Sequence, residues 1–166
     1  MAKYEGGDRY LDPQTGVLRN RLGIADERRL EAAEASLVAW RSYELSQKPQ
    51  AGDFDLAHLQ AIHRPLFGDV YDWAGEIRTI DLSKGNTYFT HHAPIVSAAR
   101  LIFENLKKER YFRGLNADAF SERAAYDWGE INALHPFREG NGRAQREFIH
   151  HLQDFRLEFH KLDYLI

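Results

Sequence analysis

The sequence predicts a mainly α-helical single domain that carries one small β-hairpin. Several stretches place apolar residues at helical spacing, and two short β-prone runs flank a turn that contains glycine. The chain has 166 residues, of which 43% are apolar and 13% aromatic, which is enough for one sizeable core. This composition argues against a disordered chain.

The charge and the cysteine content exclude several classes of function. The formal net charge of −3 gives no reason to expect general affinity for a nucleic-acid backbone. Cysteine is absent from the sequence, so neither a disulfide framework nor a thiolate metal site is expected. The first residues lack the apolar core of a signal peptide, and no run has the roughly 18 apolar residues that a membrane span needs. We therefore expect a cytoplasmic protein without a direct nucleic-acid or membrane partner.

The N-terminal part is expected to divide into an extension and the start of the domain. Residues 1–24 contain Gly6, Gly7, Pro13 and Gly16 and predict a loop-rich extension, whereas residues 25–166 are expected to form the domain. A helix is predicted from Asp26 to about Ser46, with one apolar face made of Leu30, Ala33, Leu37 and Trp40.

A second helix is predicted from about Asp55 to Leu66. Pro49 and Gly52 separate it from the first helix, and Pro65 indicates an early stop or a kink. Its inward-facing residues are expected to be Leu56, Leu59, Ile62 and Leu66.

The hairpin is predicted to follow this helix. Residues 77–81 and 87–90 are β-prone, and the turn between them is expected at Ser83–Asn86. An isolated two-stranded hairpin is only marginally stable, so this one must lie on the helical body.

Three more helices are predicted in the C-terminal half. One runs from Ile95 to Lys108, and another from Ala117 to Leu134, which we expect to be the longest and most central helix. A third is expected from Arg143 through Phe155. No clear stop signal follows Phe155, which leaves open whether the domain is truncated at its C-terminus. The expected inward residues of the first two helices are Ile95, Ala98, Ala99, Ile102, Leu106, Phe120, Ala124, Trp128, Ile131 and Leu134.

The segment His135–Arg146 reads His-Pro-Phe-Arg-Glu-Gly-Asn-Gly-Arg-Ala-Gln-Arg and is the densest in reactive groups. Its proline and glycines predict a helix end, a tight loop and the start of another helix. Free N–H groups at a helix N-terminus bind anions, and glycines let a phosphate approach the backbone. Arg143 and Arg146 are three residues apart and are expected to share a face of this helix.

The same segment contains a candidate base and a candidate metal ligand. His135 can accept a proton near neutral pH. Glu139 can hold one Mg²⁺, which usually takes one or two carboxylates and completes its shell with phosphate oxygens and water. A single histidine or arginine pair is usually structural, but the ordered combination predicts a nucleotide-phosphate transfer site.

The segment resembles the signature of Fic-domain proteins, His-Pro-Phe-x-(Asp/Glu)-Gly-Asn-Gly-Arg-x-x-Arg, at every fixed position. Residues 62–64 and 70–79 also resemble an upstream segment of that family. The resemblance implies a Fic-type helical bundle that transfers AMP from ATP to a hydroxyl side chain of a target protein and releases pyrophosphate. Its fold would include a hairpin flap that pairs with the target backbone, with Lys84, Gly85, Asn86 and Thr87 at the tip.

The resemblance also implies a role for each motif residue. His135 would deprotonate the target hydroxyl, and Glu139 would hold the Mg²⁺ that bridges the α- and β-phosphates. The anion hole would consist of Gly140, Asn141 and Gly142. Arg143 would contact the phosphate chain, and Arg146 would orient the γ-phosphate.

Two alternatives stay open. Doc-like kinases of the family carry lysine in place of the second glycine, so Gly142 favours adenylylation over phosphorylation. A non-catalytic nucleotide-binding regulator would not need the base that His135 provides. Some family members also use nucleotide-containing donors other than ATP.

The last expectation concerns regulation. Many Fic proteins contain an inhibitory (Ser/Thr)-x-x-x-Glu-(Gly/Asn) sequence, and this chain lacks it. The resemblance therefore implies a separate small antitoxin whose glutamate pairs with Arg146. The N-terminal stretch, with Tyr10-Leu11-Asp12-Pro13, also resembles bacterial Fic toxins, whose targets are the ATPase subunits of gyrase and topoisomerase IV.

Overall fold

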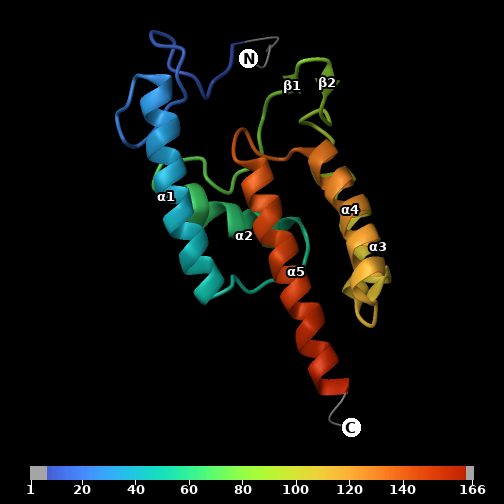
Figure 1. The fold of residues 1–166 in the computed structure, drawn as a ribbon. Helices are drawn as coiled ribbons and strands as arrows, with labels where there is room; N and C mark the ends of the chain where they lie inside the picture. Colours follow the sequence, from blue (N-terminus) through green and yellow to red (C-terminus); the bar gives the residue numbers. More distant parts are fainter. Residues whose placement is uncertain (1–6, 164–166) are drawn as a thin grey trace.

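Five α-helices and a two-stranded antiparallel sheet make up the part of the chain that the structure, a computed structural model, describes: residues 7–163 (Figure 1). The predicted mainly helical class with a small hairpin is thus confirmed. In chain order the elements are α1 (Glu27–Gln47), α2 (Leu56–Phe67), β1 (Ser83–Lys84), β2 (Thr87–Tyr88), α3 (Ile95–Lys108), the short 3-10 turn η1 (Arg110–Phe112), α4 (Ala117–Leu134) and α5 (Asn141–Asp163).

Side-chain caps explain where three of the helices begin. Asp26, Asp55 and Asn116 precede α1, α2 and α4, and each side chain accepts a hydrogen bond from the backbone N–H three residues later. The predicted starts of these helices are therefore confirmed to within a residue. The expectation that Ala117–Leu134 is the longest helix is wrong, because α4 has 18 residues and α5 has 23.

The helices pack around α5, which occupies the middle of the molecule in Figure 1, with α1 and α2 on one side of it and α4 on the other. The core includes fully buried residues of α2 and α5: Leu59, Ile62, Leu66, Phe148 and Leu152. Three of the four inward residues predicted for α2 are among them. Pro65 does not stop the helix early, since α2 continues to Phe67.

The buried face of α1 differs from the predicted one. Trp40 was expected to point inward, but 59% of it is exposed, beside the equally exposed Tyr43. The buried residues of this helix are Leu30, Glu34, Val38 and Leu45. The first three follow each other at intervals of four along one stripe of the helix. Because this stripe contains a glutamate, a prediction from apolar residues alone placed the buried face on the neighbouring stripe instead.

The hairpin also differs from its predicted position. Its strands are β1 and β2, within and just after the segment expected to be the turn, and Ser83 pairs with Tyr88. The actual turn is Gly85-Asn86, where Gly85 has a φ of +60° as two-residue hairpins of this kind require. Residues 77–81 are not a strand, because the N–H of Arg78 donates to the carbonyl of Pro136 instead, at 2.9 Å.

Three segments gather at one end of the molecule (Figure 1): the hairpin, the loop between α4 and α5, and the expected extension before α1, which is called the N-terminal lead-in below. The described part of this lead-in, residues 7–24, forms turns and a bridge between Leu11 and Leu18, and Tyr10 is buried against the ring of Trp73. The first six residues of the expected extension and the last three of the chain lie outside the described residues. Among the helices described, none combines the length and the apolar character that crossing a membrane demands.

Candidate active site

His135 lies where α4 ends. It is the C-cap residue of the helix and has left-handed backbone angles, φ 47° and ψ 60°. Such a conformation is costly for a residue with a side chain and persists only where its surroundings hold it. The ring of Phe89, which directly follows β2, stacks on the imidazole, with the centroids 3.7 Å apart and the planes at 17°.

The hydrogen bonding of His135 defines its tautomer. Nδ1 lies 3.2 Å from the carbonyl oxygen of Asn132, and since a carbonyl only accepts, Nδ1 carries the proton. Nε2 is then the basic nitrogen. Burial, helped by the nearby positive charge of Arg78, lowers the pKa of His135 to about 4, although the hydrogen bond to Asn132 acts in the opposite direction. The imidazole is therefore neutral at physiological pH and able to accept a proton.

Gly140 and Asn141 shape the loop that leads into α5. Gly140 has a φ of +79°, and a Cβ added there would lie 2.3 Å from Cζ of Phe67, so both the backbone and the packing require glycine. The side chain of Asn141 bridges the loop, since Oδ1 accepts from the N–H of Phe137 at 2.9 Å and Nδ2 donates to its carbonyl at 2.8 Å. The Asn141 side chain thus holds the loop together, and only the backbone N–H of this residue is available to an anion.

The start of α5 offers backbone donors. The N–H groups of Arg143 and Ala144 already donate to the carbonyl of Gly140. This leaves the amides of Asn141 and Gly142 for a ligand, as the first N–H groups of a helix have no partner within it. A Cβ added to Gly142 would meet nothing within 4 Å. Packing does not require glycine at this position, and the space beside it is open.

Glu139 is the carboxylate nearest these donors in the chain. Its Oε1 accepts from the N–H of Gly140 at 2.8 Å and lies 3.5 Å from Nη2 of Arg143. Its side chain is 43% exposed, so the carboxylate remains accessible. Among the side chains that the structure describes, those of residues 7–157, no group of three or more acidic or histidine side chains could enclose a metal ion. A cation here would take one protein carboxylate and otherwise phosphate and water oxygens, which suits Mg²⁺.

Arg143 is held by residues that the sequence analysis missed. Its Nη2 lies 2.5 Å from Oε1 of Glu34 on α1, and its guanidinium covers the ring of Phe67 at 4.7 Å. The hydroxyl of Tyr71 donates to the other oxygen of Glu34. Burial and this bond raise the pKa of Tyr71, so it remains protonated. An acidic residue on the buried stripe of α1 was the signal available in the sequence, had that stripe been identified.

A second ion pair, which is buried, attaches the N-terminal lead-in to the motif. Nε and Nη2 of Arg138 donate to Oδ2 of Asp8 at 2.9 and 2.8 Å, and both side chains are buried. Arg138 occupies the variable position of the motif, which the sequence analysis left without a role. The contact brings residues of the lead-in, including Leu11 and Val17, to one wall of the cleft described next.

A cleft of about 780 Å³ brings these features together. Of the residues singled out in the sequence it is lined by His135, Glu139, Asn141, Gly142, Arg143 and Lys84. Gly140 is buried beneath it against Phe67, and Gly85, Asn86 and Thr87 are exposed on the hairpin. Arg143 lines the cleft, whereas Arg146 is exposed on α5 and is not among the lining residues, and the roles expected of the two arginines stay predictions.

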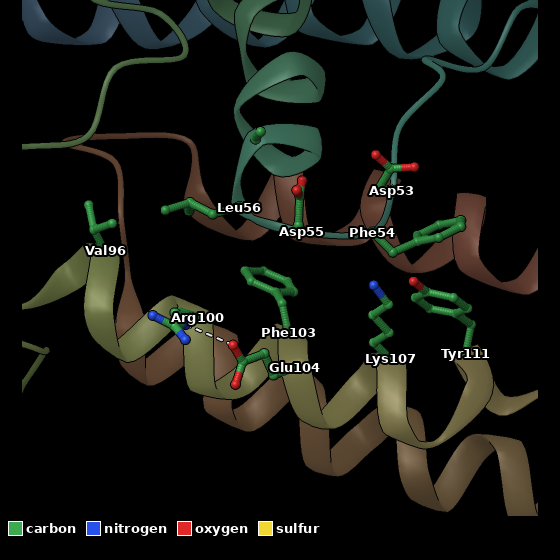
Figure 2. Close-up of a pocket in the computed structure, with 11 residues that line it drawn as sticks. Asp53, Phe54, Asp55, Leu56, Val96, Arg100, Phe103, Glu104, Lys107 and Tyr111 are labelled. Carbon is green, nitrogen blue, oxygen red and sulfur yellow. Dashed lines mark hydrogen bonds and ion pairs between the residues drawn. The ribbon is translucent and has the colours of Figure 1, made fainter.

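A second hollow of about 570 Å³ lies between the start of α2 and α3 (Figure 2). Figure 2 shows Arg100 and Glu104 of α3 paired with each other and Lys107 facing the aromatic rings of Phe54 and Tyr111. No residue of the His135–Arg146 segment is among those that line it. The base and the helix N-terminus identify the first cleft as the candidate active site.

The fold and this cleft define a class of protein: a helical domain that places a neutral histidine, a carboxylate and a helix N-terminus around one cleft. A family model described as Fic/DOC matches residues 53–153, and the chain belongs to that family.

Relatives and solved structures agree with this assignment. The chain is 53% identical over 150 residues to the protein adenylyltransferase VbhT of Bartonella schoenbuchensis, covering 90% of this chain but only 31% of VbhT. It is 42% identical to the probable protein adenylyltransferase Fic of Escherichia coli, covering 89% of this chain and 73% of that protein. BepC of Bartonella tribocorum with bound AMPPNP is similar in structure, with a TM-score of 0.82 at 27% identity, covering 89% of this chain and 77% of that one.

His63, on α2, is hydrogen-bonded to the loop between α4 and α5 that carries the motif. Nδ1 accepts from the N–H of Gly75 at 2.9 Å, and Nε2 donates to the carbonyl of Glu139 at 2.9 Å, so the neutral ring satisfies both partners. The ring is fully buried and packs against Phe137, with the centroids 3.9 Å apart. A proton on Nδ1 would face the N–H of Gly75 and break this arrangement.

We predict that protonation of His63 makes the fold acid-sensitive. Burial lowers its pKa to about 4, from 6.5 for an exposed histidine. Between these values the unfolded state binds more protons, so the free energy of unfolding falls as the pH drops from 6.5 towards 4. Urea unfolding of wild type and His63→Gln at pH 7 and pH 5 measures the effect. Wild type should lose up to about 2 kcal/mol more than the variant. Equal losses would contradict the assignment.

Proposed function

We propose that this protein is an adenylyltransferase that moves AMP from ATP to a hydroxyl side chain of a target protein and releases pyrophosphate. The observation that carries the proposal is the neutral His135, with Nε2 free to accept a proton, in one cleft with the N-terminus of α5. The names of VbhT and of the Escherichia coli relative, and the AMPPNP bound to BepC, support the same activity.

In this reaction each residue has a defined task. Nε2 of His135 takes the proton as the target oxygen forms a bond to the α-phosphorus. The bond from that phosphorus to the bridging oxygen breaks, and pyrophosphate leaves. The amides of Asn141 and Gly142 are placed to stabilise charge on phosphate oxygens, together with the positive end of α5. Arg143 is oriented by Glu34, so its position does not have to be organised when ATP binds.

Glu139 is the residue that would hold Mg²⁺ together with ATP. The exposed carboxylate at the edge of the phosphate-binding loop fits an ion that brings its remaining oxygen ligands with the nucleotide. When bound, Mg²⁺ neutralises phosphate charge. The remaining work of binding and proton transfer belongs to the protein side chains and amides described above.

Labelled ATP separates this activity from the two alternatives. We expect label from the α-phosphate to appear on protein after incubation with a cell lysate and Mg²⁺, and label from the γ-phosphate not to appear. Transfer of the γ-label would instead establish a Doc-like kinase. Binding of ATP without transfer of either label would establish a nucleotide-binding regulator.

We propose that the hairpin docks the target. Its turn residues and Tyr88, which is 84% exposed, face solvent, and the sheet has only two strands, so the outer edge of each strand has no strand beside it. An extended target segment could add to such an edge through main-chain hydrogen bonds, which would place its hydroxyl near His135. Lys84 on β1 lines the cleft, so the hairpin lies beside the reacting groups.

Shortening the hairpin is predicted to reduce labelling of the protein target while ATP binding survives. Deletion of Gly85 and Asn86 should lower the transfer rate by about tenfold or more through lost target positioning. Isothermal titration with a non-hydrolysable ATP analogue provides the measurement of nucleotide affinity. A parallel collapse of that affinity would show that the hairpin belongs to the nucleotide pocket instead.

We further propose that the protein is a toxin restrained by a small antitoxin, which supplies a glutamate to Arg146. Arg146 is exposed, and within the described part of the chain no carboxylate lies in ion-pair distance of it. An arginine can pair in a bidentate way with either a carboxylate or a γ-phosphate, so a partner glutamate would compete with correctly placed ATP. The proposed targets are the ATPase subunits of gyrase and topoisomerase IV, carried over from the resemblance to bacterial Fic toxins.

Co-expression with the neighbouring gene product tests this regulation. Transfer of the α-label to purified gyrase ATPase subunit should be suppressed in the complex and restored by a Glu→Gly change in the partner. Full activity of the wild-type complex, or the absence of a stable complex, would count against a dedicated antitoxin. Labelling of other proteins but not of the gyrase subunit would reject the target alone.

A further inference from the structure

A buried arginine connects the hairpin to the end of α4. Arg78 precedes the hairpin, and its side chain is only 2% exposed. Its guanidinium donates to four backbone carbonyls: to His135 at 2.7 Å, to Ile80 at 2.6 Å, to Leu134 at 3.4 Å, and through a short bond to Thr90. These carbonyls belong to the segments before and after the hairpin and to the C-terminus of α4.

The charge of Arg78 complements α4. The last turn of α4 has no basic residue of its own, although its C-terminal carbonyls carry the negative end of the helix dipole. Arg78 supplies that cation from another segment. In the part of the chain that the structure describes, no carboxylate lies within ion-pair distance of its guanidinium, so its partners are these carbonyls. Burial lowers the pKa of Arg78, but an arginine side chain stays protonated in proteins.

Backbone bonds strengthen the same junction. The N–H of Arg78 donates to the carbonyl of Pro136 at 2.9 Å. The N–H and the hydroxyl of Thr90, just after the hairpin, both donate to the carbonyl of Ala133, at 2.9 and 3.1 Å. Both ends of the hairpin and the strained His135 therefore meet at one guanidinium. Phe89, which stacks on the imidazole, lies between the clamped Thr90 and β2.

We propose that Arg78 is a positioning residue for nucleotide transfer: it holds the hairpin and His135 in one fixed relation. The target docked on the hairpin is then presented to Nε2 of His135 at the geometry that proton transfer requires. Arg78 contacts neither the nucleotide nor the target, and it acts through the backbone of His135, Ile80 and Thr90. This inference rests on the proposed transferase function.

Lysine in place of Arg78 is the most direct test. It keeps the positive charge, but one ammonium cannot reproduce a planar fork that reaches four carbonyls. Arg156→Lys is the matched control. Arg156 is likewise buried, donates to a backbone carbonyl, that of Leu115, at 2.5 Å, and covers the ring of Phe120, away from the cleft.

The expected result is a selective loss of transfer. Arg78→Lys should lower kcat for protein labelling by about 10- to 100-fold, as small misplacements in active sites do. Its affinity for the non-hydrolysable ATP analogue should stay within about threefold of wild type, about 0.7 kcal/mol. Hydrogen exchange at the Thr90 amide should accelerate by more than about tenfold. Arg156→Lys should lower the melting temperature about as much as Arg78→Lys does, but its kcat should stay within about twofold of wild type.

Three results would overturn the proposal. The first is a kcat of Arg78→Lys within about twofold of wild type, and the second is a loss of nucleotide affinity as large as the loss of kcat. If Arg78→Lys does not fold, hydrogen exchange in the wild-type protein decides: the amides of Arg78, Thr90 and His135 should open together. Exchange of Thr90 more than about tenfold faster than His135 is the third result. A wild type that transfers no nucleotide would reject the proposed function. The hydrogen-exchange measurement would still test whether Arg78 holds both ends of the hairpin to the end of α4.

Discussion

Replacing His135 with alanine is expected to lower the rate of AMP transfer by a factor of about 10²–10⁴, the usual contribution of a general base. Nε2 is the available base of the imidazole, because Nδ1 is committed to the carbonyl of Asn132. Affinity for an ATP analogue should change only a few-fold, since the amides of Asn141 and Gly142 and the side chain of Arg143 remain. Transfer of the α-label under single-turnover conditions provides the measurement.

His150→Ala is the matched control, because His150 is exposed on α5 and does not line the cleft. It should transfer AMP at the wild-type rate. The pH profile adds an independent signature: since burial lowers the pKa of His135 to about 4, activity should persist well below pH 6.5 as the pH is lowered. Full activity of purified His135→Ala, or an acid limb centred near 6.5, would contradict the role assigned to this residue.

Alanine at Gly140 is expected to destabilise the protein severely. A side chain at a φ of +79° costs about 1–2 kcal/mol, and the Cβ would lie 2.3 Å from Phe67, adding an overpacking cost of about 1–3 kcal/mol. The total, about 2–5 kcal/mol, is a large part of the 5–15 kcal/mol by which most domains are stable. Chemical denaturation monitored by circular dichroism measures it directly.

Gly142→Ala separates packing from ligand binding at the neighbouring glycine. An added Cβ there meets no protein atom within 4 Å, so stability should stay within about 1 kcal/mol of wild type. The methyl group would occupy space beside the anion-binding amides, and ATP affinity should fall by about tenfold, or about 1.4 kcal/mol. Equal destabilisation by both substitutions, or unchanged ATP affinity of Gly142→Ala, would contradict this distinction.

The helices and the loop that carries the motif were predictable because their signals are local. Asp26, Asp55 and Asn116 cap helices at the start of apolar periodic stretches, and capping depends on residues only three positions apart. His135, Glu139 and the glycines follow each other within one loop, so their order alone indicates a helix end and a helix start. His135, Glu139, Gly142 and Arg143 all line one cleft, as expected of residues that lie close together in one loop and the helix start that follows it.

The errors and omissions arise where residues distant in sequence meet. The expected strand at residues 77–81 failed because Arg78 bonds to the end of α4, more than fifty positions later in the sequence. Trp40 was assigned to the core because nothing in the apolar pattern shows that Glu34 is buried opposite Arg143. Likewise, the pairing of Asp8 with Arg138 has no local sequence signal.

The sequence by itself determined the family, the helical fold and the loop between two helices that carries the motif, because each depends on short-range patterns of capping, periodicity and turn chemistry. Only the tertiary structure decided the tautomer and the neutrality of His135, the orientation of Arg143 by Glu34, and the clamp at Arg78. Those properties depend on burial and on hydrogen bonds between distant segments. Desolvation and long-range pairing exist only once the chain has folded, so no local pattern could specify them.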